Sequence, residues 1–390
     1  WHTLSHGERK RAQIGAMMWL APAVAAVDEP TNHIDADARA ALVSALKHFR
    51  GVGLLVSHDR DLLDTLCHQC IFVDPPEVTM RPGGYTQGTA QAETEREQVR
   101  AEDVLARREA KRLEREARRR RSLADKAARL RSKRGLTIKD HDAREKINKA
   151  RLTGKDAVGG NLVRRMQRRL ERVEEHRKGI AVKKTYQTGI WMPGSHCKRD
   201  TLLRIKAGCL PLGEERSLRF DDLLMVPGDR IALTGPNGTG KTTLVRHMVH
   251  LHTLPSERVT YLPQEVSASD SRGLIDEVRA LPHRQLGAAM TVVSRLGSRP
   301  ERLLETDLPS PGEVRKLLIA LGAAREPWLI VMDEPTNHLD LVSIRCLEAA
   351  LDDCPAGLLL VSHDRRFLKR LTRTRWALTE EEGGVRVLSS

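Results

Sequence analysis

The sequence has few aromatic residues, and one long stretch has none. Phe, Trp and Tyr make up 3% of the 390 residues, and none of them occurs between Tyr85 and Tyr186. Aromatic side chains are the platforms on which proteins stack unpaired bases. Their absence excludes base stacking by this stretch. Any nucleic acid bound there must be recognised through its phosphates and shape, as suits folded RNA.

Cysteines and long apolar runs are also scarce. The six cysteines are scattered, and no secretory leader is visible, which indicates a reducing cytoplasm. Cys67 and Cys70 form a single CxxC, and without a second pair an incidental arrangement is favoured over a zinc site. No apolar run approaches the ~20 residues that span a bilayer. We therefore expect a cytoplasmic protein with no membrane domain in the chain.

Positive charge is concentrated in one region. The formal net charge is +14, and residues 91–180 hold 29 Lys and Arg against 16 Asp and Glu, which is nearly the whole excess. A local excess of this kind indicates a polyanionic partner. The alternative is a solvated helical hairpin whose charges only face water.

The same region predicts an antiparallel helical hairpin. Thr89 to Arg134 contains no Gly or Pro, so we expect one helix, roughly 70 Å long. Residues 161–178 supply a second helix, with Asn161 as its cap, and residues 135–160 form a basic tip between them. The expected apolar seams are Val99, Leu105, Leu113, Leu123 and Leu130 on the first helix, and Leu162, Val163, Met166, Leu170 and Val173 on the second.

One block of sequence occurs twice, at a constant offset of 305 residues. Residues 4–63 return as residues 309–368, without insertion, so the chain holds two copies of one module. Only the second copy is preceded by a phosphate loop, and applying the offset to Lys241 gives a position before Trp1. We therefore expect the chain to be a fragment of a longer protein. The paired positions are Asp28 with Asp333, Glu29 with Glu334, Asp35 with Asp340, and His58 with His363.

Each copy alternates strands and helices. In the first copy we expect a helix after Ser5, strands at 23–27 and 52–56, and a helix at about 36–47, followed by a turn-rich joint at 81–88. The second module opens with short strands at 185–224. A strand at 230–234 then leads into the phosphate loop, and a helical insert follows at 273–305.

The phosphate loop carries the most specific chemistry. Gly235-x-x-x-x-Gly240-Lys241-Thr242 follows an apolar strand and opens a helix, which is the context that this motif requires. Its glycines let backbone N–H groups surround a phosphate at the positive end of the helix. Lys241 is expected to bridge the β- and γ-phosphates, and Thr242 to bind Mg²⁺. Further along, Asp333 suits the Mg²⁺ shell and Glu334 a general base.

Three kinds of motif occur twice, once on each side of a charged connector. They are the signature, as LSHGE and PSPGE, the motif DEPTNH and the motif VSHD, and together they resemble the motifs of the ABC ATPases. Within them the match is to the ABC-F branch, which has two nucleotide-binding domains and no membrane domain. The resemblance implies an α/β fold with P-loop ABC-type nucleotide-binding domains, the first one partial, joined by a long α-helical hairpin linker. The implied domains are 1–85, 86–184 and 185–390.

The resemblance also assigns the site. It implies two domains that close head to tail on ATP, each site combining one phosphate loop with the other domain's signature. Catalysis falls to Glu334 and His363, and in the first copy to Glu29 and His58. The implied Mg²⁺ ligands are Thr242, Gln264 and Asp333. Nucleotide binding is assigned to Gly235, Pro236, Asn237, Gly238, Thr239, Gly240, Lys241, Thr242, Thr243, Gln264 and Asp333, and to the signature residues Ser5, Gly7, Glu8, Ser310, Gly312 and Glu313, with Asp35 in the D-loop.

Two departures from the family pattern concern nucleotide binding. Pro311 stands where the signature usually has Gly, and it lacks a donor N–H, so a weaker grip on phosphate is expected. Residues 207–213 contain no aromatic side chain, although ABC domains usually stack adenine there, so base selectivity is expected to be loose.

The expected function is that of an ATP- and Mg²⁺-dependent ATPase that acts on translation. The resemblance implies binding to the ribosome, with the basic linker 91–180 reaching ribosomal RNA and tRNA. Ribosomal protection against antibiotics is favoured over a housekeeping translation factor, because the tip and the SPGE signature look more like the resistance group. The sequence favours less strongly a transporter ATPase, a DNA-repair ATPase with a coiled-coil arm, or an inactive fragment.

Overall fold

The computed structural model confirms the α/β fold class with a long helical hairpin. Its residues form two compact units, one made of residues 1–85 with 185–390 and the other of residues 86–184. None of the helices among the described residues is both long and apolar enough to cross a membrane. The described residues are 6–31, 34, 36–74, 76–130, 155–180, 192, 195, 197–213, 216–306, 309–381 and 384–389.

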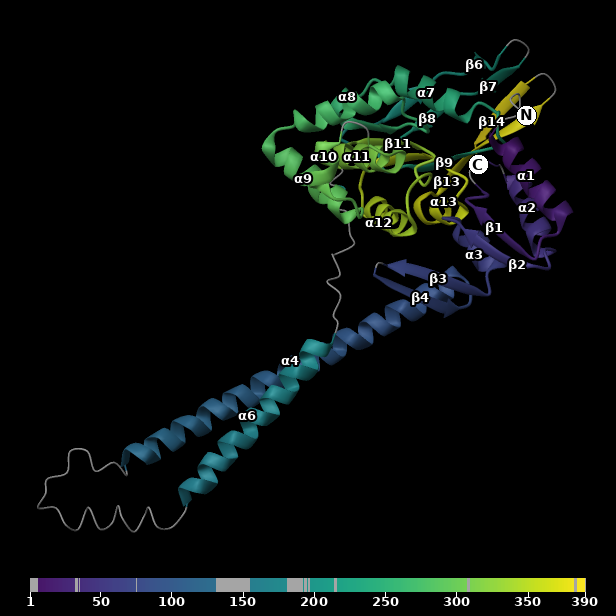
Figure 1. Cartoon of the computed structure of the whole chain (residues 1–390). Coiled ribbons are helices and arrows are strands. Elements are labelled where there is room, and N and C mark those ends of the chain that lie inside the picture. The colour runs from purple at the N-terminus through teal and green to yellow at the C-terminus, as the bar shows by residue number, and fades with distance from the viewer. Residues whose placement is uncertain are drawn as a thin grey trace, which may run out of the picture. The chain divides into compact units, whose positions relative to one another are not determined.

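An eight-stranded sheet forms the centre of the second copy (Figure 1). Its strand order is β10-β11-β12-β9-β13-β14-β7-β6, and the first five strands run parallel. A separate two-stranded sheet pairs β5 with β8. The strands are β5 (Leu203–Ile205), β6 (Gly208–Pro211), β7 (Ser217–Phe220), β8 (Leu223–Met225), β9 (Arg230–Thr234), β10 (Val259–Leu262), β11 (Leu329–Asp333), β12 (Gly357–Val361), β13 (Thr374–Glu381) and β14 (Gly384–Ser389).

Helices cover this sheet and complete its core. Every residue of β11 and β12 is buried, as expected for parallel strands with both faces covered. The predicted helical insert appears as α8, α9 and α10, of which α8 and α9 pack against α11 (Figure 1). The helices are α7 (Lys241–Leu251), α8 (Ala268–Arg279), α9 (His283–Arg295), α10 (Pro300–Glu305), α11 (Pro311–Ala324), α12 (Leu341–Asp352) and α13 (Arg365–Leu371), with a 3₁₀ turn η1 (Ser256–Arg258).

The first copy repeats part of this arrangement. β1 pairs with β2 in parallel, as β11 pairs with β12, and β3 pairs with β4, as β13 pairs with β14. The hairpin of β3 and β4 was not predicted. The elements are α1 (His6–Leu20), β1 (Val24–Asp28), α2 (Ala36–Lys47), β2 (Val52–Val56), α3 (Arg60–Leu66), β3 (Gln69–Asp74) and β4 (Glu77–Pro82).

The two copies differ at the centre of the sheet. In the second copy β9 lies between β12 and β13, whereas the corresponding β2 and β3 lie in separate two-stranded sheets. Apolar side chains on these small sheets are exposed, because nothing among the described residues covers them as β9 and its neighbours do in the second copy. They are Val24, Val52, Leu54 and Val56 on the first sheet, and Ile71, Val73, Val78 and Met80 on the second.

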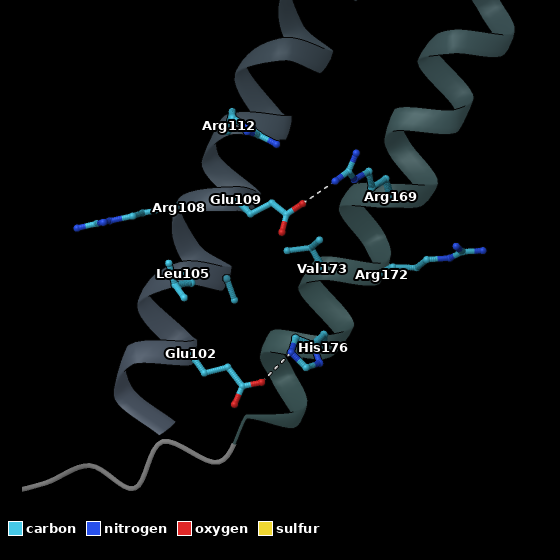
Figure 2. A pocket seen from close by; sticks show the side chains of 10 residues that line it. Glu102, Leu105, Arg108, Glu109, Arg112, Arg169, Arg172, Val173 and His176 are labelled. Atoms are coloured by element: carbon cyan, nitrogen blue, oxygen red, sulfur yellow. Dashed lines mark hydrogen bonds and ion pairs between the residues drawn. The ribbon is translucent and has the colours of Figure 1, made fainter. Parts of the chain in front are cut away.

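The smaller unit is the helical hairpin of α4 (Tyr85–Leu130) and α6 (Lys155–Gly179). Glu109 accepts a hydrogen bond from Arg169 at 2.9 Å, and Glu102 lies 3.1 Å from Nε2 of His176 (Figure 2). Moving seven residues toward the C-terminus on α4, from Glu102 to Glu109, thus corresponds to moving seven residues toward the N-terminus on α6, from His176 to Arg169. The helices are therefore antiparallel, as predicted.

Several details of the hairpin differ from the sequence expectation. α4 begins at Tyr85, inside the predicted joint, and α6 begins at Lys155, so Asn161 lies inside the helix and the expected cap is wrong. On α4, Leu113 is buried as predicted. Leu105 and Leu123 are exposed, and the small residues Ala106 and Ala110 are buried instead. The rest of the predicted tip, residues 135–154, lies outside the described residues.

Truncation of Phe367 tests the core of the second copy. Its side chain on α13 is completely buried in the larger apolar cluster, so Phe367→Ala leaves a cavity and is expected to reduce the free energy of unfolding by roughly 3–5 kcal/mol. Urea denaturation measures this loss. Val342→Ala on α12 is the control, because Val342 is 58% exposed and its truncation should change stability by less than about 0.5 kcal/mol. Equal losses in both variants would contradict the packing.

Candidate functional site

The phosphate loop connects β9 to α7. Gly240 precedes α7 with a positive φ of 89°, and Gly238 has φ 79°, a region that side chains with a Cβ rarely adopt. A Cβ on Gly240 would lie 2.6 Å from Leu212 Cδ2, so the side chain of Leu212 would have to shift as well. Nζ of Lys241 donates to the carbonyl oxygens of Gly235 and Pro236, both at 2.8 Å. The loop is therefore curled with its lysine folded over it.

Three predicted cation ligands meet beside this loop. Thr242 Oγ1 lies 2.7 Å from Asp333 Oδ2 and 3.2 Å from Gln264 Oε1. Oδ1 of Asp333 is buried and has no hydrogen-bond partner. Burial raises the pKa of Asp333, while the Thr242 hydroxyl and Lys241 oppose that rise. Hydroxyl, amide and carboxylate oxygens with one unsatisfied buried oxygen suit a hard cation such as Mg²⁺.

Glu334 follows Asp333 at the end of β11 and is buried, with 5% exposure. Its φ of 49° turns the side chain off the strand, and its N–H donates to the carbonyl of Val361 at 2.8 Å, which holds this unusual backbone. Burial raises the pKa of Glu334 to about 8, although the His363 N–H hydrogen bond opposes the shift. A carboxyl group with a pKa near neutrality is suited to general acid–base work.

His363 connects the carboxylate to the phosphate loop. Its backbone N–H donates to Glu334 Oε2 at 3.2 Å, and its ring Nε2 lies 3.5 Å from Glu334 Oε1. The same Nε2 lies 3.2 Å from Oδ1 of Asn237 in the loop. The histidine therefore touches both the group that could activate water and the loop that would hold phosphates.

The first copy reproduces the carboxylate–histidine pair. Glu29 follows Asp28 with φ 43°, donates from its N–H to the carbonyl of Val56 at 2.8 Å, and lies 3.5 Å from Nε2 of His58. Burial raises the pKa of Glu29, and the nearby His58 opposes the rise. The local geometry at the end of β1 is thus the geometry at the end of β11.

The second signature is held by its own helix cap. Ser310 and Glu313 cap α11 reciprocally, each side chain bonding the other residue's backbone N–H, and Pro311 occupies the first helical position, where a missing N–H removes no helical bond. A Cβ on Gly312 would lie 2.7 Å from the carbonyl oxygen of His338, which explains the glycine. In the first copy Gly7 and Glu8 lie in α1. Ser5 and Asp35 lie outside the described residues.

Arg315 was not identified from the sequence. The residue is 5% exposed, and its guanidinium donates to the backbone carbonyl of Glu334, and to that of Gln264 at 2.7 Å. Burial lowers the pKa of Arg315 to about 10, which the nearby Glu334 and Asp333 oppose. The residue connects the backbone of Glu334 to that of Gln264. Its counterpart Lys10 is also basic and donates to the carbonyl of Asp28, so the signal in the sequence was a basic residue at both positions of the repeat, without its partner.

Cys67 and Cys70 are free thiols in the structure. Burial raises the pKa of both, that of Cys70 to about 11. Among the residues described, no group of three or more His, Cys, Asp and Glu side chains is placed to hold a metal ion.

The chain is similar in sequence to a known family and to several known proteins. The family described as "ABC transporter" matches residues 221–337. The "Ribosome protection protein VmlR" of Bacillus subtilis is 27% identical over 387 residues, covering 97% of this chain and 69% of the relative. The "ATP-binding protein Uup" of Caulobacter vibrioides is 29% identical over 406 residues, covering 98% and 60%. This chain therefore spans about two thirds of the length of these relatives.

A solved structure shares the fold. The archaeal ribosome recycling factor aABCE1, solved in complex with the ribosomal stalk protein aP1, matches with a TM-score of 0.60 at 18% identity. The match covers 99% of this chain and 64% of that one. At this identity the likeness bears on the fold alone.

Replacing Glu334 tests its buried state. Between about pH 4.5 and 8 the folded chain holds a proton that the unfolded chain releases, so the free energy of unfolding falls as the pH rises across this window. Glu334→Gln removes this contribution, which is on the order of a few kcal/mol. Urea denaturation at several pH values measures it. Parallel curves for the two proteins would contradict the burial, and Glu305→Gln, on the exposed end of α10, is the control.

Proposed function

We propose that this chain is a member of the ABC-F branch of the ABC ATPases, and that it is an Mg²⁺-dependent ATPase that binds the ribosome and acts on translation. The observation that carries the proposal is that one chain holds an ABC site together with a basic helical hairpin between two ABC copies. A similar sequence over 97% of the chain carries the name of a ribosome protection protein.

The hairpin supports an RNA partner. Arg108, Arg118 and Arg119 are exposed on α4, and Arg168 and Arg172 on α6. Arginine contacts phosphate bidentately and needs no unpaired base, which suits a hairpin without aromatic side chains. Electrostatic binding of this kind weakens steeply as the salt concentration rises.

The proposed chemistry follows from the positions of the side chains. When bound, ATP would supply the phosphoryl group, and Mg²⁺ would neutralise the charge of its phosphate oxygens. Lys241 and the loop N–H groups hold the phosphates, and Thr242, Gln264 and Asp333 hold the cation. The carboxylate of Glu334 takes a proton from the attacking water. The oxygen of that water bonds to the γ-phosphorus, and the bond between the γ-phosphorus and the ADP oxygen breaks. His363 orients that carboxylate through its N–H and ring nitrogen.

Changing Glu334 to Gln tests the activity and the partner together. Loss of the base is expected to slow phosphate release roughly 10²–10⁴-fold while ATP binding remains. Trapped with ATP, the variant should pellet with ribosomes, and it should stay in the supernatant without nucleotide. Sedimentation and a phosphate assay on the same samples provide both measurements.

The matched control is Glu29→Gln, the equivalent change in the first copy. The chain holds one GxxxxGK[ST] sequence, which lies in the second copy, so Glu29→Gln should reduce phosphate release far less than Glu334→Gln. Equal losses in the two variants would contradict the assignment of catalysis to Glu334. Failure to pellet under any nucleotide would remove the ribosome as partner and favour a transporter ATPase.

Within this function, ribosome protection against antibiotics is the finer proposal. It is supported by the name of one relative and by the PSPGE signature, whereas other relatives carry only ATP-binding names. Expression in a drug-sensitive bacterium is expected to raise the inhibitory drug concentration several-fold, and the Glu334→Gln variant should not. Unchanged sensitivity, with ribosome binding intact, would favour a housekeeping translation factor instead.

A further inference from the structure

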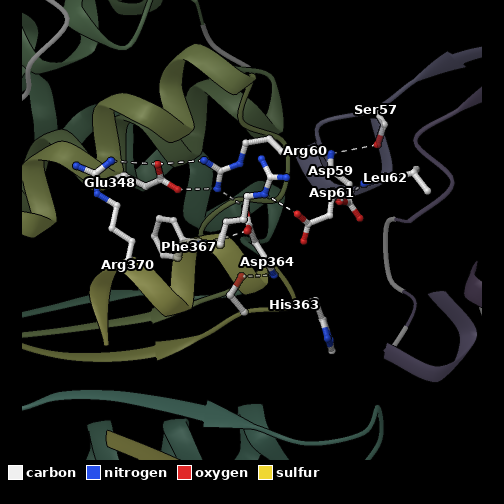
Figure 3. Close-up of polar contacts among 12 residues, drawn as sticks. Ser57, Asp59, Arg60, Asp61, Leu62, Glu348, His363, Asp364, Phe367 and Arg370 are labelled. Carbon is white, nitrogen blue, oxygen red and sulfur yellow. Dashed lines mark hydrogen bonds and ion pairs between the residues drawn. The ribbon is translucent and has the colours of Figure 1, made fainter. Parts of the chain in front are cut away.

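A buried arginine of the first copy is neutralised by the second copy. Arg60 begins α3, and its side chain is only 9% exposed. Its guanidinium donates to Glu348 on α12 at 2.6 and 3.1 Å, and to Asp364 at 2.9 Å (Figure 3). These carboxylates lie 288 and 304 residues away. A buried charge without such partners would be strongly unfavourable, so the second copy is what allows Arg60 to be buried.

In a second set of ion pairs, the arginine belongs to the second copy and the carboxylates belong to the first. Arg366 on α13 donates to Asp61, and to Asp64 at 2.7 Å, both of the first copy. Asp61 and Arg366 are equivalent positions of the repeat, 305 residues apart. Two identical copies meeting at this point would place like charges together. The divergence to Asp in one copy and Arg in the other makes the contact attractive.

The equivalent positions elsewhere confirm that this surface is asymmetric. The counterpart of Arg60 is Arg365, which is exposed, and the counterpart of Glu348 is Val43, which carries no charge. In the first copy the capping residue Asp59 is paired with Arg39 of α2 at 2.6 Å instead of with the other copy. The charges on this surface are therefore complementary only when a first copy meets a second copy.

Arg60 reaches the segment that carries His363. Asp364, its partner, directly follows His363 and caps α13 by accepting from the Phe367 N–H at 2.9 Å. The N–H of Asp364 is held by Ser362 Oγ at 3.1 Å. His363 in turn contacts Glu334 and the phosphate loop. One side chain of the first copy thus ends one residue from the catalytic histidine of the second.

We infer that α3 of the first copy pairs with α12 and α13 of the second copy through complementary charges. Across this contact, Arg60 acts as a positioning residue for His363. The partner of each face is the other copy in the same chain. The pairing does not depend on the proposed function, whereas the role of Arg60 toward His363 rests on it.

Hydrogen exchange followed by mass spectrometry tests the pairing without nucleotide or ribosome. Arg60→Met is expected to raise exchange rates about tenfold in α12 and α13, and Glu348→Gln to raise them in α3. The double variant should exchange no faster than the more affected single variant, because the two changes remove the same contact. Arg365→Met, the exposed counterpart, is the matched control and should leave both segments unchanged.

Other outcomes overturn the inference. If each single change affects exchange only around its own position, or if the double variant shows the sum of two independent effects, the copies do not meet here. Arg60→Lys keeps the charge and one hydrogen bond, so it should recover most of the protection. It also provides a folded protein for the same comparison if Arg60→Met unfolds the first copy.

ATP hydrolysis tests the link to His363 separately. Arg60→Met is expected to lower kcat about tenfold with KM changed less than twofold, and Arg60→Lys to restore part of kcat. A change in KM alone, or equal losses in the Arg365→Met control, would contradict the positioning role. If the unaltered chain does not hydrolyse ATP, the proposed function fails, while the exchange experiment still decides the pairing.

Discussion

Parallel pairing of β9, β12 and β11 is the constraint on which the candidate site depends. Because parallel strands end at one edge of a sheet, the phosphate loop after β9, His363 after β12 and the acidic pair at the end of β11 are brought together there. The register pairs Asp333 with Val361, and the next residue, Glu334, bonds back to Val361 through its N–H. Loss of this register would separate groups that now lie within 2.7–3.5 Å of one another.

Burial of a charged side chain is unfavourable, and the fold deals with this in two ways. At Asp333 and Glu334 it raises the carboxyl pKa values and leaves oxygens without hydrogen-bond partners, which is a state that a cation and water can satisfy. At Arg60 it supplies two carboxylates, so the charge is kept and paired. The first arrangement suits a site that binds and reacts. The second suits a contact that must persist.

Much of this could be predicted from the sequence, because the decisive signals are local. The phosphate loop, the acidic pair and the alternation of strands and helices are each read within ten or twenty residues, and the repeat places them twice. The strands β3 and β4 were missed, although Ile71, Phe72 and Val73 form a short apolar run that is typical of a strand. On α4, Leu105 was expected to be buried in the seam, but it is exposed, and the smaller Ala106 and Ala110 are buried. The partners of Arg60 and Arg315 depend on the folded chain, and single-sequence patterns carry no such information.

The two copies keep the chemistry alike and make the contact different. Glu29 with His58 and Glu334 with His363 have the same positive φ at the glutamate and the same 3.5 Å separation, so the duplicated block preserves this carboxylate–histidine pair. Position 61 and its equivalent, 366, by contrast, have opposite charges. A surface between identical modules cannot distinguish one copy from the other, whereas opposite charges at equivalent positions can. Opposite charges at the contact, beside unchanged geometry at the two carboxylate–histidine pairs, are what a pairing between two different copies requires.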